Sequence, residues 1–164
     1  MAATKDASLL EIFVDADACP VKAEVERVAD RHNLTVHVVS NGGIRPSANP
    51  RVKTVVVNEG ADAADNWIAE QIGEGDIAVT ADIPLASRCL AKGARVLRHN
   101  GKPFTDADIG MALGMRELSR HLREVTGNQT FHAGFAKEDR SRFLGALENE
   151  IQAIKRKTAG NRPI

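Results

Sequence analysis

Residues 9–17, with the sequence LLEIFVDAD, place two carboxylates at the end of an apolar run. The run centres on Ile12, Phe13 and Val14, a composition typical of a strand buried inside a sheet. We therefore expect a strand over residues 9–15. A carboxylate that directly follows such a strand needs a compensating partner, because a buried unpaired charge is costly. Asp15 is for this reason a candidate functional residue.

The rest of the chain alternates between short apolar runs and helical patterns, which is typical of a parallel α/β sheet. Further strands are expected at residues 35–40, 52–57, 76–82 and 94–99. Helices are expected at residues 20–33, 62–72, 105–125 and 137–156, with a short one between Pro84 and Gly93. Pro20 suits a helix start, and Asn33 suits a left-handed helix end. We interpret residues 1–130 as one α/β domain and 131–164 as its helical C-terminal extension.

Composition indicates a globular protein of the cytoplasm. Of the 164 residues, 27% are charged and 43% are hydrophobic, which argues against disorder. Lys5, Asp6 and Glu11 interrupt the N-terminal segment, and no apolar run reaches membrane-spanning length. The two cysteines, Cys19 and Cys89, lack metal-ligand spacing and are expected to be reduced.

The net charge of zero hides an uneven distribution. Residues 1–30 hold 3 basic and 7 acidic side chains, and residues 52–90 hold 2 and 7. Residues 31–51 hold 3 and 0, and residues 91–164 hold 14 and 8. Such a chain can place an acidic centre beside a basic rim, an arrangement that suits a polyanionic substrate. Ordinary solvated helix faces would give the same counts.

Acidic residues gather where the expected strands end. Asp15 and Asp17 follow the first strand, Asp82 ends the fourth, and Asp62 with Asp65 open the helix after the third. In a parallel sheet these carboxyl ends share one edge, and strands 1 and 4 are commonly neighbours there. Clustered carboxylates repel one another unless a cation neutralises them, and Mg²⁺ or Mn²⁺ prefers such oxygen ligands. This pattern predicts a divalent-metal site that hydrolyses a phosphodiester.

Structural roles remain open for several of these acids. Asp62 and Asp65 also fit an N-cap and the N3 position, where the helix dipole favours acids. Asp17 could cap the first helix through its turn. Thr80 and Ser87 could assist a ligand through their hydroxyls, although turn or surface positions would suit them equally.

Three other residues near strand or helix ends could take part. Cys19 at a helix start could be an activated thiol, but a small structural residue fits that turn better. Lys22, in the first turn of the same helix, could face an incoming phosphate or simply be solvated. His99 follows the fifth strand, and none of the five histidines shows metal-ligand spacing.

Four segments together resemble a known family. They are IFVDADACPVKAEV (12–25), NEGADAADNWIAEQI (58–72), DIAVTADIPLASRCLAKGA (76–94) and FTDADIGMALGMRELSRHLRE (104–124). In this order they resemble the YaiI/YqxD family of largely uncharacterised bacterial proteins, which is grouped with PIN-like nuclease domains. The resemblance covers about residues 10–155.

This resemblance implies a three-layer PIN-like fold, with a mainly parallel five-stranded sheet and helices on both faces. It also implies that Asp15, Asp65 (or Asp62) and Asp82 are the catalytic acids, with Thr80 as the threonine of a Thr-x-Asp segment. Asp17 would be an extra carboxylate that PIN-like domains do not require. PIN-like relatives that bind RNA without cutting it exist, so the fold alone does not establish the activity.

Three functions therefore compete. The first is a metal-dependent nuclease acting on RNA, and the second is a non-catalytic nucleic-acid-binding module. Phosphate contacts in either would come from Lys22 and from basic residues after position 91, namely Lys92, Arg95, Arg98, Lys102, Arg116, Arg120 and Arg123. The third is a haloacid-dehalogenase-type phosphatase that uses Asp15 as nucleophile and Asp17 as acid. Ala18 stands where that motif has threonine, which ranks this function last. The sequence leaves open whether the protein is a monomer or a homodimer.

Overall fold

The computed structural model describes residues 10–16, 19–42, 45–57, 62–105, 107 and 137–160. The strands are β1 (Glu11–Asp15), β2 (Thr35–Ser40), β3 (Val52–Val56), β4 (Ile77–Val79) and β5 (Arg95–Leu97). The helices are α1 (Lys22–His32), α2 (Ala63–Gln71), α3 (Ile83–Ala91) and α5 (Lys137–Gly160). The helix expected at residues 105–125 lies almost entirely outside the described residues, as does the domain division near residue 130.

The five strands form one sheet in the order β3-β2-β1-β4-β5, and every pair is parallel. β1 lies at the centre, where Val14 is paired with Val38 of β2 and Val79 of β4. The expected neighbourhood of strands 1 and 4 is thus confirmed. The order changes direction at β1, and this switch point is where α/β sheets open a crevice for ligands.

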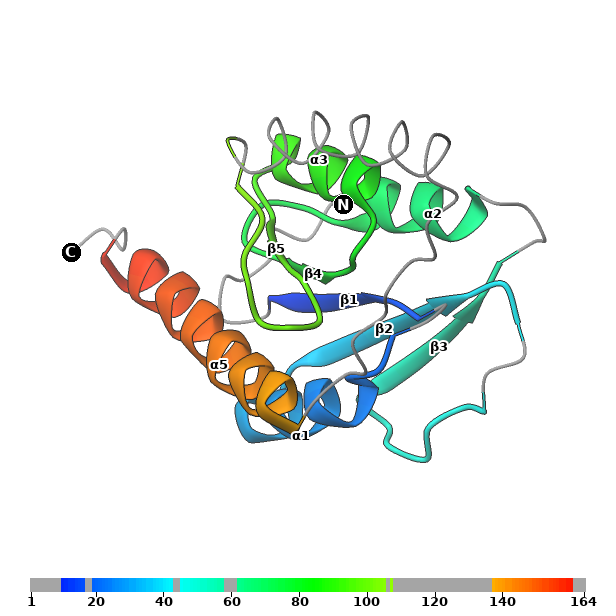
Figure 1. The fold of residues 1–164 in the computed structure, drawn as a ribbon, viewed down its shortest axis with the longest axis horizontal. Coiled ribbons are helices and arrows are strands. Elements are labelled where there is room, and N and C mark those ends of the chain that lie inside the picture. Colours follow the sequence, from blue (N-terminus) through cyan, green and yellow to red (C-terminus); the bar gives the residue numbers. More distant parts are fainter. Residues whose placement is uncertain are drawn as a thin grey trace, which may run out of the picture.

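Helices cover both faces of the sheet (Figure 1), which confirms the three-layer α/β fold. On one face, α1 and α5 bury an apolar cluster that includes Val25, Phe143 and Leu147. On the other face, α2 and α3 bury a second cluster that includes Ile68 and Leu85. The sheet therefore lies between two separate cores, as expected when parallel strands are apolar on both sides. This arrangement is consistent with a PIN-like fold.

Helix α1 begins later than the sequence predicts. Val21 occupies its N-cap position and Lys22 its first turn, so Pro20 precedes the helix instead of opening it. The Pro20 carbonyl accepts a hydrogen bond of 2.8 Å from Arg140 of α5. At the other end Asn33 adopts the expected left-handed conformation, with φ of 57°. Because α1 follows β1, its N-terminus lies at the carboxyl edge of the sheet.

Among the other elements, β4 and α5 depart furthest from their expected bounds. β4 was expected over residues 76–82 but includes only Ile77–Val79, because Thr80 and Asp82 already shape the start of α3. α5 extends beyond the expected end at residue 156 to Gly160. None of the helices within the described ranges has the length and apolarity needed to cross a membrane.

Candidate functional site at the carboxyl edge of the sheet

Asp15 ends β1 and faces Thr80, the residue that directly follows the neighbouring strand β4. The Thr80 hydroxyl donates a hydrogen bond of 2.9 Å to Asp15 Oδ2. Thr80 is fully buried and Asp15 is half-buried. This contact supplies the compensating partner that a carboxylate after a buried strand requires. The predicted threonine therefore orients the first predicted aspartate.

Asp82 is connected to the same threonine. Its backbone N–H donates to Thr80 Oγ1 over 3.0 Å, so Thr80 joins Asp15 to Asp82 through one hydroxyl. Asp82 is also the N-cap of α3, and its Oδ1 accepts a hydrogen bond of 2.8 Å from the Leu85 N–H. This capping role was missed in the sequence, although an aspartate two residues before Pro84 is a recognisable helix start.

Asp65 belongs to a third element, because it lies in the first turn of α2. The pKa of its carboxyl is raised to about 6, first by partial burial and then by the negative charges of Asp82, Asp15 and Asp62. The opposing effect comes from Arg88 of α3, whose guanidinium also donates to Asn66 over 2.8 Å. Carboxylates from β1, α2 and the start of α3 thus share one electrostatic environment.

Asp62 occupies the N-cap position of α2, but its side chain makes no capping hydrogen bond. The capping role that the sequence left open for it is therefore not seen. The side chain is exposed, and its charge acts on Asp65. Asp17 lies outside the described residues.

The donor set fits a hard divalent cation in chemistry, since all its ligands would be carboxylate oxygens. The distances between these side chains fit a cation less well. Among the described residues, no three His, Cys, Asp or Glu side chains are grouped closely enough to hold a metal ion. Asp82 is engaged in its helix cap and Asp15 with Thr80. A cation would therefore have to draw Asp15, Asp65 and Asp82 together against their mutual repulsion.

Four other candidates from the sequence, Ser87, Arg98, His99 and Cys19, differ in their surroundings. Ser87 is exposed on α3. The Arg98 guanidinium lies 4.1 Å from the Phe104 ring centre, a cation–π contact. Burial lowers the pKa of His99. Burial raises the pKa of the Cys19 thiol to about 11, which agrees with its structural interpretation and argues against a nucleophile.

Two of the expected phosphate-binding residues lie at the opposite edge. Arg95 begins β5 and pairs with Glu150 of α5 over 2.6 Å. Lys92 precedes β5, and its ammonium donates to the Ala69 and Glu70 carbonyls at the end of α2. Both serve the fold, which removes them from the proposed basic rim. Arg116, Arg120 and Arg123 lie outside the described residues, whereas Lys102 is exposed.

Another acid, Asp76, shows what a purely structural aspartate looks like here. It is fully buried at the amino edge, where it accepts hydrogen bonds from the Glu11 and Gly73 N–H groups at 3.0 and 2.9 Å. The acids of the carboxyl edge differ from it because they act on one another.

The fold and this acidic edge define an α/β protein with a parallel sheet and acidic residues at its switch point. Its sequence matches, over residues 13–153, the family described as uncharacterized BCR, YaiI/YqxD family. The chain belongs to this family, as its four motifs predict.

Curated relatives carry the name UPF0178 protein. Those of Parvibaculum lavamentivorans and Ruegeria pomeroyi are each 58% identical, covering 91% of this chain and 98% of the relative. That of Rhodospirillum rubrum is 58% identical and covers 90% of this chain and 99% of the relative. No solved structure matches the chain.

Proposed function

We propose that the protein is a divalent-metal-dependent nuclease that hydrolyses RNA at the carboxyl edge of its sheet. The observation that supports this proposal is that the charges of Asp15 and Asp82 act on Asp65, so that three elements contribute to one acidic edge. Asp15 and Asp82 share the Thr80 hydroxyl, and both raise the pKa of Asp65. A fold that only needed helix caps would not require carboxylates that destabilise one another.

Each residue has a distinct part in this proposal. Thr80 holds the Asp15 carboxylate in a fixed orientation, and the α3 cap holds Asp82. Asp65 completes the set from α2, with Asp62 and Asp17 as further carboxylates. Bound Mg²⁺ or Mn²⁺ would supply an activated water and stabilise the in-line displacement. Lys22, Arg98 and the Ser87 hydroxyl are the proposed contacts to substrate phosphates.

The reaction is hydrolysis: a bond forms between the water oxygen and phosphorus, and the bond from phosphorus to the leaving nucleoside oxygen breaks. The leaving oxygen takes up the proton that the water releases. Because the protein residues act by orientation and charge, replacing one carboxylate by its amide should remove activity with little change in shape.

The test is cleavage of a single-stranded RNA in Mn²⁺, comparing the wild type with Asp15→Asn and Asp65→Asn. We expect each variant to lose at least about a hundredfold in rate, and chelator to abolish the wild-type activity. Glu70→Gln is the matched control, because Glu70 is exposed near the other end of α2. Full activity in Asp15→Asn would refute the proposal.

Two outcomes would favour the alternatives. RNA binding without any wild-type cleavage would indicate the non-catalytic module. Hydrolysis of an aryl phosphate that depends on Asp15, without RNA cleavage, would indicate the phosphatase.

A further inference from the structure

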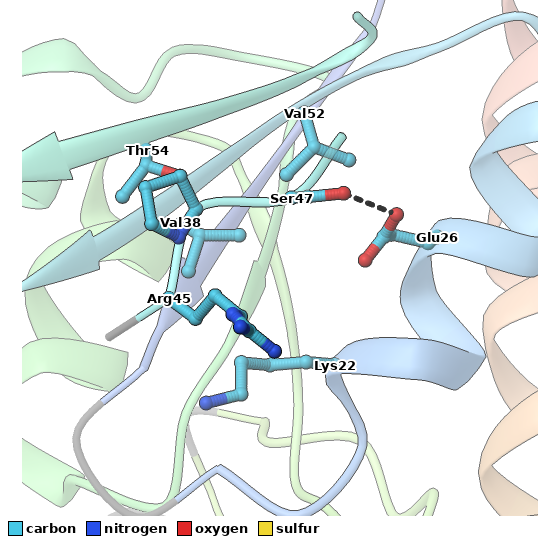
Figure 2. A pocket seen from close by; sticks show the side chains of 8 residues that line it. Lys22, Glu26, Val38, Arg45, Ser47, Val52 and Thr54 are labelled. Atoms are coloured by element: carbon cyan, nitrogen blue, oxygen red, sulfur yellow. Dashed lines mark hydrogen bonds between the residues drawn. The ribbon is translucent and has the colours of Figure 1, made fainter. Parts of the chain in front are cut away.

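A cavity of about 450 Å³ lies on the α1 face of the sheet, beside its β2–β3 half. Its walls come from α1, β2, β3 and the loop between the last two (Figure 2). The lining residues are Lys22, Glu26, Val38, Arg45, Pro46, Ser47, Val52 and Thr54. Four separate segments of the chain thus build one pocket.

Two cations lie in this pocket without an acidic partner. Within the described residues, neither the Lys22 ammonium nor the Arg45 guanidinium makes a hydrogen bond or ion pair. The pocket's own acid, Glu26, instead accepts a hydrogen bond of 2.8 Å from the Ser47 hydroxyl. In Figure 2, Arg45 and Lys22 extend into the same part of the pocket, away from the Ser47–Glu26 hydrogen bond. Two like charges placed this way favour an anion between them, and arginine is suited to phosphate.

The rest of the pocket suits a ring system. Val38 and Val52 are buried and give it an apolar floor, and Thr54 and Ser47 add hydroxyl groups. Its volume falls within the range of about 300–1,000 Å³ that is usual for small-molecule sites. A free phosphate would occupy only a part of this space. The chemistry therefore matches a phosphate that is attached to a flat, partly apolar body with hydrogen-bonding groups.

The cationic end of the pocket lies toward the aspartates. Lys22 opens α1 at the carboxyl edge, where Asp15 also lies. A phosphate bound by Lys22 would thus be next to the acidic edge.

We infer that this pocket binds the phosphorylated terminal nucleotide of the RNA strand, with Lys22 and Arg45 on its phosphate. The inference rests on the proposed nuclease function and extends it to the substrate end. A strand anchored here extends from the pocket toward Asp15, Asp65 and Asp82, so cleavage is measured from the phosphorylated end. Val38 and Val52 contact the base, and the Thr54 hydroxyl supplies a hydrogen bond.

The first experiment measures binding by isothermal titration calorimetry with the full chain, in chelator. The probes are adenosine 5′-monophosphate, adenosine and inorganic phosphate. We expect the monophosphate to bind at least about tenfold more tightly than either part. Arg45→Gln and Lys22→Gln should each weaken it about tenfold, because each removes a charge-assisted contact. Arg27→Gln is the control, since Arg27 is an exposed α1 cation outside the pocket.

Equal binding of adenosine and its monophosphate would overturn the inference, as would an equal effect of Arg27→Gln. So would the absence of any monophosphate binding. A second arm compares short RNAs that carry a 5′-phosphate, a 3′-phosphate or no terminal phosphate, again in chelator. A preference for one phosphorylated end that Arg45→Gln removes supports the inference and identifies the end.

Chelator separates this inference from the nuclease proposal, because the pocket needs no metal. Nucleotide binding that depends on Arg45, in a protein that cleaves nothing, would leave the pocket assigned and the nuclease proposal refuted. Cleavage that depends on the aspartates but is indifferent to Arg45 and to the terminal phosphate would do the reverse.

Discussion

The Asp65 carboxyl has a pKa of about 6 because it is partly buried and faces Asp82, Asp15 and Asp62. Its ordinary pKa is 3.8, so the folded state holds this proton more tightly than the unfolded state. The associated stability is fully present below about pH 4 and is lost as pH rises through about 6.

We therefore predict that Asp65→Asn removes this loss in the metal-free protein. Because the carboxyl is only partly buried, solvent screening reduces the effect to about 1 kcal/mol, or about 2–4 °C in Tm. Thermal melts of both proteins in chelator, between pH 4 and pH 8, measure it. The difference in Tm between variant and wild type should grow in favour of the variant across this range. A difference that stays constant with pH would show that Asp65 titrates normally.

Metal binding should offset the repulsion among these carboxylates. A cation that binds only the folded state stabilises it by mass action, by about 2.7 kcal/mol at a hundred times Kd. We expect saturating Mg²⁺ or Mn²⁺ to raise the Tm of the wild type by about 5–10 °C. Asp15→Asn should lose this response, whereas Glu70→Gln should keep it. An undiminished response in Asp15→Asn would mean that Asp15 is not a ligand.

At the scale of elements, α5 is fixed to the sheet by both apolar and polar contacts. Phe143, Leu147 and Ile151 are fully buried in the core beneath α1. Glu148 accepts hydrogen bonds from Gln152 and from His32 of α1, and these lower the pKa of its carboxyl. The helix that the sequence assigns to a C-terminal extension thus completes one of the two cores.

The turn after β5 is fitted closely to this helix. Gly101 has a φ of +87°, and a Cβ there would lie 2.8 Å from the Arg142 carbonyl oxygen of α5. We predict that Gly101→Ala destabilises the protein by about 2 kcal/mol or more, because it adds backbone strain to a clash with backbone. Urea unfolding measures this as a lower midpoint.

Gly145→Ala is the matched control within α5. Gly145 is exposed, and a Cβ there would meet nothing within 4 Å. Alanine should therefore stabilise the helix by about 0.5–1 kcal/mol. If both substitutions left the stability unchanged, the close contact between residue 101 and the α5 backbone would be contradicted.

For the molecule as a whole, the sequence predicted the layers, the neighbouring strands 1 and 4, and the bounds of β2 at Thr35–Ser40. Alternating apolar runs and helical patterns carry this information locally. The length of β4 was wrong because the Thr80 and Asp82 side chains bond the backbone of a turn, which a run of apolar letters does not reveal.

The candidate site was predictable only in part, for a similar reason. Asp15, Asp65 and Asp82 each follow a strand or open a helix, so topology alone predicts that they meet. The pocket was not predictable, because Arg45 lies in an irregular loop that only the fold brings to Lys22. For Lys92 and Arg95 the sequence led to an expectation of phosphate contacts. In the structure, Lys92 donates to a carbonyl of α2 and Arg95 pairs with Glu150, both at the amino edge of the sheet.

The final prediction separates binding from cutting, and it uses the double role of Asp82. Asparagine caps helices as well as aspartate does, so Asp82→Asn should keep α3 while removing one carboxylate. Phosphate contacts come from basic residues, whose binding to RNA weakens as salt rises. Cleavage, by contrast, depends on the acids.

We therefore expect Asp82→Asn to lose Mn²⁺-dependent cleavage of single-stranded RNA while it binds that RNA at least as tightly as the wild type. The slope of log K against log salt should not change, because the number of phosphate contacts is the same. Fluorescence anisotropy in chelator at several salt concentrations gives the slope, and a gel assay with Mn²⁺ gives the cleavage rate. Circular dichroism checks that α3 has survived the substitution. Cleavage at the full wild-type rate in Asp82→Asn would identify a contaminating nuclease as its source, since this carboxylate lies at the centre of the proposed site. If a folded Asp82→Asn variant lost both RNA binding and cleavage, this would contradict the proposal that basic residues bind the RNA and the acidic edge cleaves it.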